Sequence, residues 1–152
     1  MDFNYLNFSW IIEGALAGSV GATDRKDLFF FKMQEIASVV RLDESNISAE
    51  PWQLFELFEP IASLDNPDFA QVNRISVFIE EQFEKWERPV VVTCGTGNET
   101  TGIILACYLV YVGHSSESAI STVENARPGT MSDSDYLTIV HDYESFVRQG
   151  SS

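Results

Sequence analysis

The stretch that decides the fold runs from residue 89 to residue 102 and reads Pro-Val-Val-Val-Thr-Cys-Gly-Thr-Gly-Asn-Glu-Thr-Thr-Gly. It predicts a short buried strand, a tight glycine-bearing loop and the first turn of an apolar helix. Cys94 would then lie at the mouth of a ring of backbone N–H groups, a geometry that stabilises a thiolate or an oxyanion. We therefore expect a nucleophile position at Cys94 and an anion-binding cradle after it.

The same loop lacks the positive charges that an anion site normally uses. Residues 93–102 contain no Arg, Lys or His, and they include an acid, Glu99. An ionised carboxylate at this position opposes both a thiolate and a bound phosphate. The loop thus has the backbone scaffold of a phosphate-handling site without its charges.

This stretch resembles the signature loop of the cysteine-dependent protein tyrosine and dual-specificity phosphatases, which reads His-Cys, five residues, Arg, then Ser or Thr. Cys94, Gly97, Thr101 and Gly102 fall on the family's Cys, Gly, Ser/Thr and Gly. The resemblance implies that Cys94 is the nucleophile and that Thr101 donates a hydrogen bond to its thiolate. It implies a phosphate-binding loop made of Gly95, Thr96, Gly97, Asn98, Glu99 and Thr100.

The resemblance extends over nearly the whole chain. Within the family, the chain most resembles the small, single-domain, atypical dual-specificity phosphatases. It implies a single domain over residues 1–152, an α/β fold with three α/β/α layers and a central, mostly parallel sheet flanked by helices. The further segments that carry it are Asn7-Phe8-Ser9-Trp10, Leu16-Ala17-Gly18, residues 36–42, residues 105–110 and Ala126-Arg127-Pro128-Gly129. We expect Arg127, the one family-like arginine left near the site, to have a structural role in the turn between two helices.

Two departures from the family pattern lie in the signature loop. Thr93 replaces the His that orders the loop, and Thr100 replaces the Arg that clamps two phosphate oxygens. A threonine offers one neutral hydroxyl where the guanidinium offers a charged, bidentate fork. By analogy with the loss of one oxyanion-hole donor, about 3–4 kcal/mol of transition-state stabilisation should disappear.

A third departure concerns the general acid. The segment from Pro60 to Leu64 resembles the family's acid loop, and Ser63 falls where the family has a catalytic Asp. Serine cannot donate a proton at a suitable pKa, and loss of a general acid removes about 10²–10⁴ in rate. Asp65 and Asp68 could replace it after a loop shift, or they are turn acids around Asn66-Pro67.

Composition restricts the possible partners. The chain has 152 residues, 45% of them hydrophobic, enough for one globular core. Its 23 acids and 9 bases give a net charge of −14, which repels nucleic acid and anionic membranes.

No apolar run is long enough to span a membrane. Two cysteines do not make a disulfide framework, so a cytoplasmic location is expected. His114 and His141 lack metal-ligand spacing, and we expect neither a metal nor a cofactor.

The hydrophobic pattern predicts alternating strands and helices. We expect strands at residues 13–18, 37–42, 52–58 and 90–92, and helices at residues 25–35, 71–86, 101–111, 115–125 and 133–148. The run from Leu28 to Phe31 indicates core, or a partner-binding patch if more than two of its rings are exposed.

Three functions remain open from the sequence. The three departures, at Thr93, Thr100 and Ser63, favour a pseudophosphatase that binds or scaffolds a protein partner. The alternative is a weak cysteine phosphatase in which Cys94 attacks a phosphoprotein or a small phosphate ester. A redox role for Cys94 would need a resolving thiol, and Cys107 lies more than three helical turns along the chain.

Overall fold

The computed structural model describes residues 5–44, 46–95 and 99–150. These residues form a five-stranded sheet with the strand order β1-β2-β5-β3-β4. The strands are β1 (Ser9–Ile12), β2 (Leu16–Val20), β3 (Ser38–Arg41), β4 (Phe55–Phe58) and β5 (Val90–Cys94). The helices are α1 (Arg25–Met33), α2 (Phe69–Trp86), α3 (Glu99–Tyr111), α4 (Ser116–Ala126) and α5 (Ser134–Gly150), with short 3-10 turns η1 (Tyr5–Asn7) and η2 (Glu50–Trp52).

The central strand is β5, whose five residues are all buried. It pairs in parallel with β2 on one side and β3 on the other, while β1 is antiparallel to β2. Cys94 ends β5 opposite Val20, at the carboxyl edge of the sheet. Open parallel sheets place their ligand sites at this edge, so the strand order alone positions Cys94 at a site.

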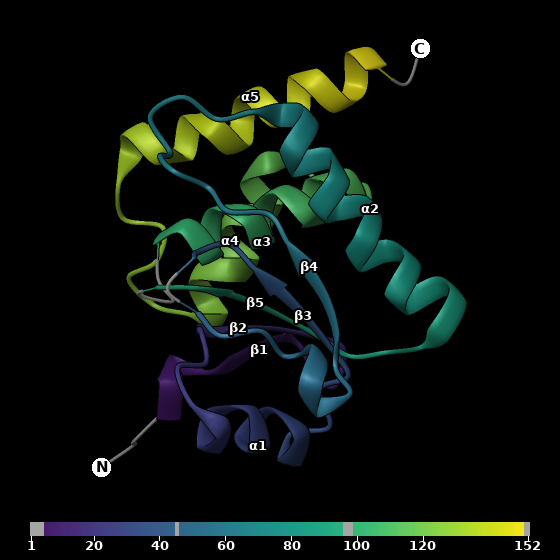
Figure 1. The fold of residues 1–152 in the computed structure, drawn as a ribbon. Coiled ribbons are helices and arrows are strands. Elements are labelled where there is room, and N and C mark those ends of the chain that lie inside the picture. The colour runs from purple at the N-terminus through teal and green to yellow at the C-terminus, as the bar shows by residue number, and fades with distance from the viewer. Residues whose placement is uncertain (1–4, 45, 96–98, 151–152) are drawn as a thin grey trace.

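Helices cover both faces of the sheet. Figure 1 shows α1 alone on one face and α2, α3, α4 and α5 on the other. Leu28 and Phe31 of α1 pack with Val39 and Val91 in the smaller of two cores. The larger core surrounds α3, in which residues 101–110 are all buried. A helix that is buried on all sides needs partners all round, and the neighbouring helices supply them.

The three-layer α/β fold with a mostly parallel sheet is confirmed, but some predicted element bounds were wrong. The strand expected at residues 13–18 begins only at Leu16, as β2, because residues 13–15 form a turn in which Gly14 has φ of 75°. The preceding strand, β1, was not predicted. The strand expected at residues 52–58 begins only at Phe55, because Gln53 is left-handed with φ of 63° and ends η2. Period-2 patterns do not mark such turns.

The aromatic run divides between core and surface. Leu28 and Phe31 are fully buried, Phe30 is half-buried and Phe29 is 58% exposed. Helical spacing of three residues puts Leu28 and Phe31 on one face and Phe29 on the other. One exposed ring is fewer than the partner-binding patch required, so the core interpretation holds for the inward face.

Candidate functional site

Cys94 lies between the end of β5 and the start of α3. Its side chain is 4% exposed, and its carbonyl accepts a hydrogen bond of 2.9 Å from the N–H of Gly21. Thr101, fully buried in the first turn of α3, donates its hydroxyl to the Cys94 sulfur at 3.0 Å. The helix N-terminus adds a positive partial charge on the same side of the thiol. The thiol therefore has the hydroxyl contact that the family pattern predicts.

The rest of the loop carries negative rather than positive charge. Thr96, Gly97 and Asn98, expected to form part of the cradle, lie outside the described residues. Glu99 is exposed at the start of α3, and Thr100 beside it is half-buried. The place of the family's clamp is thus occupied by a neutral hydroxyl next to a carboxylate.

Thr93 braces the sheet. It is buried, and its hydroxyl donates to the carbonyl oxygen of Val40 in β3 at 2.9 Å. The side-chain amide of Asn46 in turn donates to the Thr93 hydroxyl at 3.5 Å. These contacts hold β5 against β3 and the chain that follows β3.

Arg127 is the basic residue that the structure brings near the thiol. Its Nη1 donates to the carbonyl of Asn7 at 2.7 Å, to the Ser9 hydroxyl at 2.8 Å and to the carbonyl of Gly18 at 2.8 Å. Burial lowers the pKa of Arg127 to about 10, while the nearby Cys94 opposes this shift. Arg127 therefore stays charged at neutral pH. The Arg-Pro-Gly turn in the sequence predicted an arginine near the site, but it did not predict the three oxygen acceptors of Nη1.

The loop that carries Ser63, predicted to fall at the family's general-acid position, connects β4 to α2. The Ser63 hydroxyl is exposed and accepts a hydrogen bond from the N–H of Asp65 at 3.0 Å. Asp68 is the N-cap of α2, because its carboxylate accepts from the N–H groups of Ala70 and Gln71. If Asp68 acted as the general acid, its carboxylate would have to give up these two capping hydrogen bonds.

Acidic side chains gather on the other side of the site. The pKa of Tyr136, at the start of α5, is raised above its usual value, first by the charge of Asp65, then by burial and by Glu99, Asp133 and Asp135. Asp65 lies in the loop before α2, Glu99 at the start of α3, and Asp133 and Asp135 at the start of α5, so three segments contribute to the negative charge that raises this pKa. An anionic substrate that approaches from this side meets net repulsion.

Two other expectations concern cysteine and metal chemistry. Burial alone raises the pKa of the Cys107 thiol far above its usual value, which makes it a poor resolving thiol. Both cysteines are buried, and neither is part of a disulfide bond in the described structure. Within the described part of the chain, no group of three or more His, Cys, Asp or Glu side chains could hold a metal ion. His114 and His141 contact the hydroxyls of Ser118 and Ser116.

The sequence matches the family model described as "Swiss Army Knife protein, DSP-PTPase phosphatase domain" over residues 6–146. The chain therefore belongs to this family, within the protein tyrosine and dual-specificity phosphatases that its signature loop resembles. A comparison with curated proteins gave no match. Over the residues that the structure covers, none of the helices is long and apolar enough to cross a membrane.

Solved structures show the same fold. Tk-PTP in its active form is 23% identical, with a TM-score of 0.79 over 93% of this chain and 99% of its own. A mouse putative dual-specificity phosphatase complexed with zinc tungstate is 16% identical, with a TM-score of 0.82 over 99% of this chain and 94% of its own. Human DUSP28 is 14% identical, with a TM-score of 0.78 over 93% of this chain and 95% of its own.

Proposed function

We propose that this chain is a phosphatase-like domain that has lost catalysis and acts as a binding or scaffolding module for a protein partner. The observation that carries the proposal is Thr100 in the first turn of α3, where the family has its phosphate-clamping Arg. No neutral hydroxyl replaces a bidentate, charged fork on a phosphate that gains charge in the transition state. Glu99 beside it adds a negative charge to the same turn.

The remaining polar groups support the same conclusion. Arg127 is near Cys94, but its Nη1 is held by three oxygen acceptors below the sheet edge. Asp68 caps α2, and Ser63 has no acidic proton to give. The nucleophile position keeps its cysteine, but the groups that would clamp the phosphate and protonate the leaving oxygen are replaced at Thr100 and Ser63. Two buried cysteines that form no disulfide bond in the described structure also fit a module that works in a reducing cytoplasm.

The test is hydrolysis of an aryl phosphate by the full chain, with Cys94→Ser as the matched control. We expect both proteins to give the same background rate. Hydrolysis that disappears in Cys94→Ser would overturn the proposal. The double variant Thr100→Arg with Ser63→Asp restores both missing groups, so we expect it to gain Cys94-dependent turnover. If it stays inactive, the substitutions are not what blocks the reaction.

A weak cysteine phosphatase is the second candidate, favoured by the 3.0 Å contact between the Thr101 hydroxyl and the Cys94 sulfur. Its substrate would be a phosphoprotein or a small phosphate ester, bound by backbone N–H groups, with Asp65 as the acid. Alkylation of Cys94 by iodoacetamide, with and without vanadate, separates the candidates. Protection by vanadate supports the enzyme, whereas equal rates support the binding module.

A further inference from the structure

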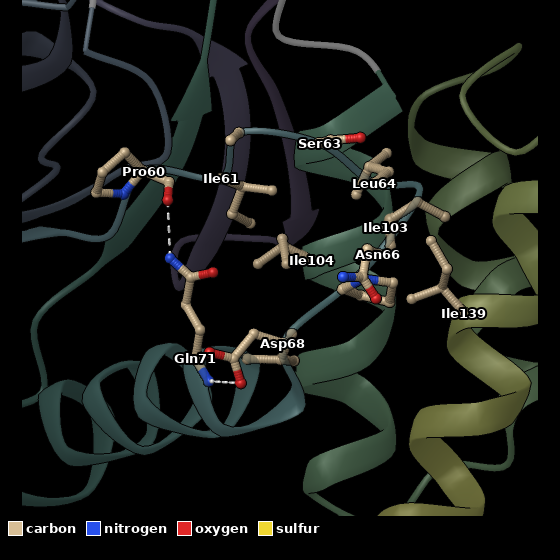
Figure 2. A pocket seen from close by; sticks show the side chains of 13 residues that line it. Pro60, Ile61, Ser63, Leu64, Asn66, Asp68, Gln71, Ile103, Ile104 and Ile139 are labelled. Carbon is tan, nitrogen blue, oxygen red and sulfur yellow. Dashed lines mark hydrogen bonds between the residues drawn. The ribbon is translucent and has the colours of Figure 1, made fainter.

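A pocket lies behind the loop that carries Ser63. Its volume is about 370 Å³, and it is enclosed by the loop of residues 60–68, the start of α2, the second turn of α3 and one turn of α5. Figure 2 shows Ile61 and Ile104 pointing toward each other at its centre, with Ile103 and Ile139 at one side. Neither Cys94 nor Thr100 lines it. None of the described residues of the phosphate-binding loop lines the pocket.

The walls of the pocket are aliphatic. They comprise Ile61, Leu64, Val72, Ile103, Ile104 and Ile139. Water inside such a pocket has few hydrogen-bonding partners, and its release on ligand binding is favourable. An apolar cavity of about 150 Å³ is large enough for benzene, so this pocket can hold a molecule roughly twice that size.

The polar side chains at the rim define the charge of the ligand. Among the described residues, no Arg, Lys or His lines the pocket, and the one carboxylate that does, Asp68, caps α2. The amide of Gln71 donates to the carbonyl of Pro60 at 2.9 Å, which leaves Asn66 as the amide at the rim. An anionic head group would be buried without a counter-charge, at a large cost. A neutral head needs one hydrogen bond only.

We propose that this pocket binds an uncharged aliphatic molecule with a single hydroxyl or amide end, held by the isoleucine walls and by the amide of Asn66. Because the loop of residues 60–68 forms one wall, the ligand also fixes the position of Ser63. The proposal does not depend on whether Cys94 is reactive.

The first experiment titrates the full chain with 1-hexanol, 1-octanol and 1-decanol and follows its isoleucine methyl groups by NMR. We expect saturable shifts at Ile61, Ile103, Ile104 and Ile139. The affinity should rise by roughly fourfold for each added methylene until the pocket is full, and then level off. Octanoate should bind about tenfold or more weakly than octanol, because its charge has no partner.

The second experiment compares two variants. Ile61→Phe fills the centre of the pocket, and Val77→Phe adds the same ring at an exposed position on α2. We expect Ile61→Phe to weaken octanol binding by about tenfold or more and Val77→Phe to leave it unchanged. Non-saturable shifts, equal binding of octanoate, or equal binding by a folded Ile61→Phe would overturn the proposal. If Ile61→Phe does not fold, the comparison of the three alcohols and octanoate on the unchanged protein still tests the proposal.

Discussion

Two adjacent threonines illustrate how a single residue decides the chemistry of this site. Thr101 is fully buried and donates to the Cys94 sulfur at 3.0 Å, as the family's hydroxyl residue would. Thr100, one position earlier, is half-buried where the family has a guanidinium. The same side chain is sufficient for one role and insufficient for the other, because a sulfur needs one donor and a phosphate needs charge.

Gly102 is required by a close approach rather than by its backbone angles. A Cβ at this position would lie 1.9 Å from Cγ2 of Thr130 and 3.0 Å from Cε of Met131. We expect Gly102→Ala to lower the free energy of unfolding by about 1–3 kcal/mol, even though Ala favours the helix. Urea denaturation of both proteins measures the change.

The control for this prediction removes the clashing atom. Thr130→Ser deletes Cγ2 and keeps the hydroxyl, so the double variant Gly102→Ala with Thr130→Ser should recover part of the lost stability. Equal losses in the single Gly102→Ala and the double variant would show that the clash with Thr130 is not the cause.

At the scale of elements, Glu124 fixes the turn between α4 and α5. Its carboxylate accepts from the N–H of Gly129 at 2.7 Å and from the N–H of Met131 at 2.9 Å. This turn begins directly after Arg127, the C-cap of α4, and it places Thr130 against Gly102 of α3. The Glu124 carboxylate therefore helps to hold the turn that positions Thr130 against α3 and that follows Arg127.

The same two N–H groups lower the pKa of Glu124 below its usual value of 4.5. As the pH falls, the unfolded chain therefore takes up this proton first, and the stability contributed by Glu124 is lost below about pH 4.5. We expect Glu124→Gln to lower the urea midpoint at pH 7 and to have a smaller effect at pH 3. Unfolding curves across this range check the prediction.

Glu117→Gln is the matched control for Glu124→Gln. Glu117 is an exposed acid in the first turn of the same helix, and no hydrogen bond of its side chain to another described residue is present. The difference between the two variants should shrink toward low pH. A Glu124→Gln effect that is independent of pH would contradict the role given to its charge.

At the scale of the whole molecule, the net charge of −14 sets a general repulsion. The carboxylates around Tyr136 concentrate part of it at the carboxyl edge of the sheet. We expect the urea midpoint to rise between about 0.02 M and 0.5 M KCl, because salt screens repulsion between surface charges. The double variant Asp65→Asn with Glu99→Gln should show a smaller rise. A midpoint that falls with salt would mean that favourable ion pairs such as Arg74–Glu59 dominate.

Much of the fold was predictable because its pattern is local. Val90 to Val92 are apolar without alternation, which predicts a strand covered on both faces, and β5 is that strand. The turn between β1 and β2 was missed, because the small apolar residues Ala15 and Ala17 flank Leu16 on both sides and do not mark where the turn ends and β2 begins. The capping role of Asp68 had a recognisable local signal, an Asp directly before an apolar helix.

The sequence by itself determined the α/β class, the strand before Cys94, the helix after it and the absence of Arg, Lys and His from residues 93–102, because each is written in neighbouring residues. Only the tertiary structure decided that Nη1 of Arg127 contacts oxygen atoms of Asn7, Ser9 and Gly18, and that aliphatic side chains from four segments line one pocket. These features join residues far apart in the chain. Their positions depend on how the helices pack on the sheet, which no local pattern encodes.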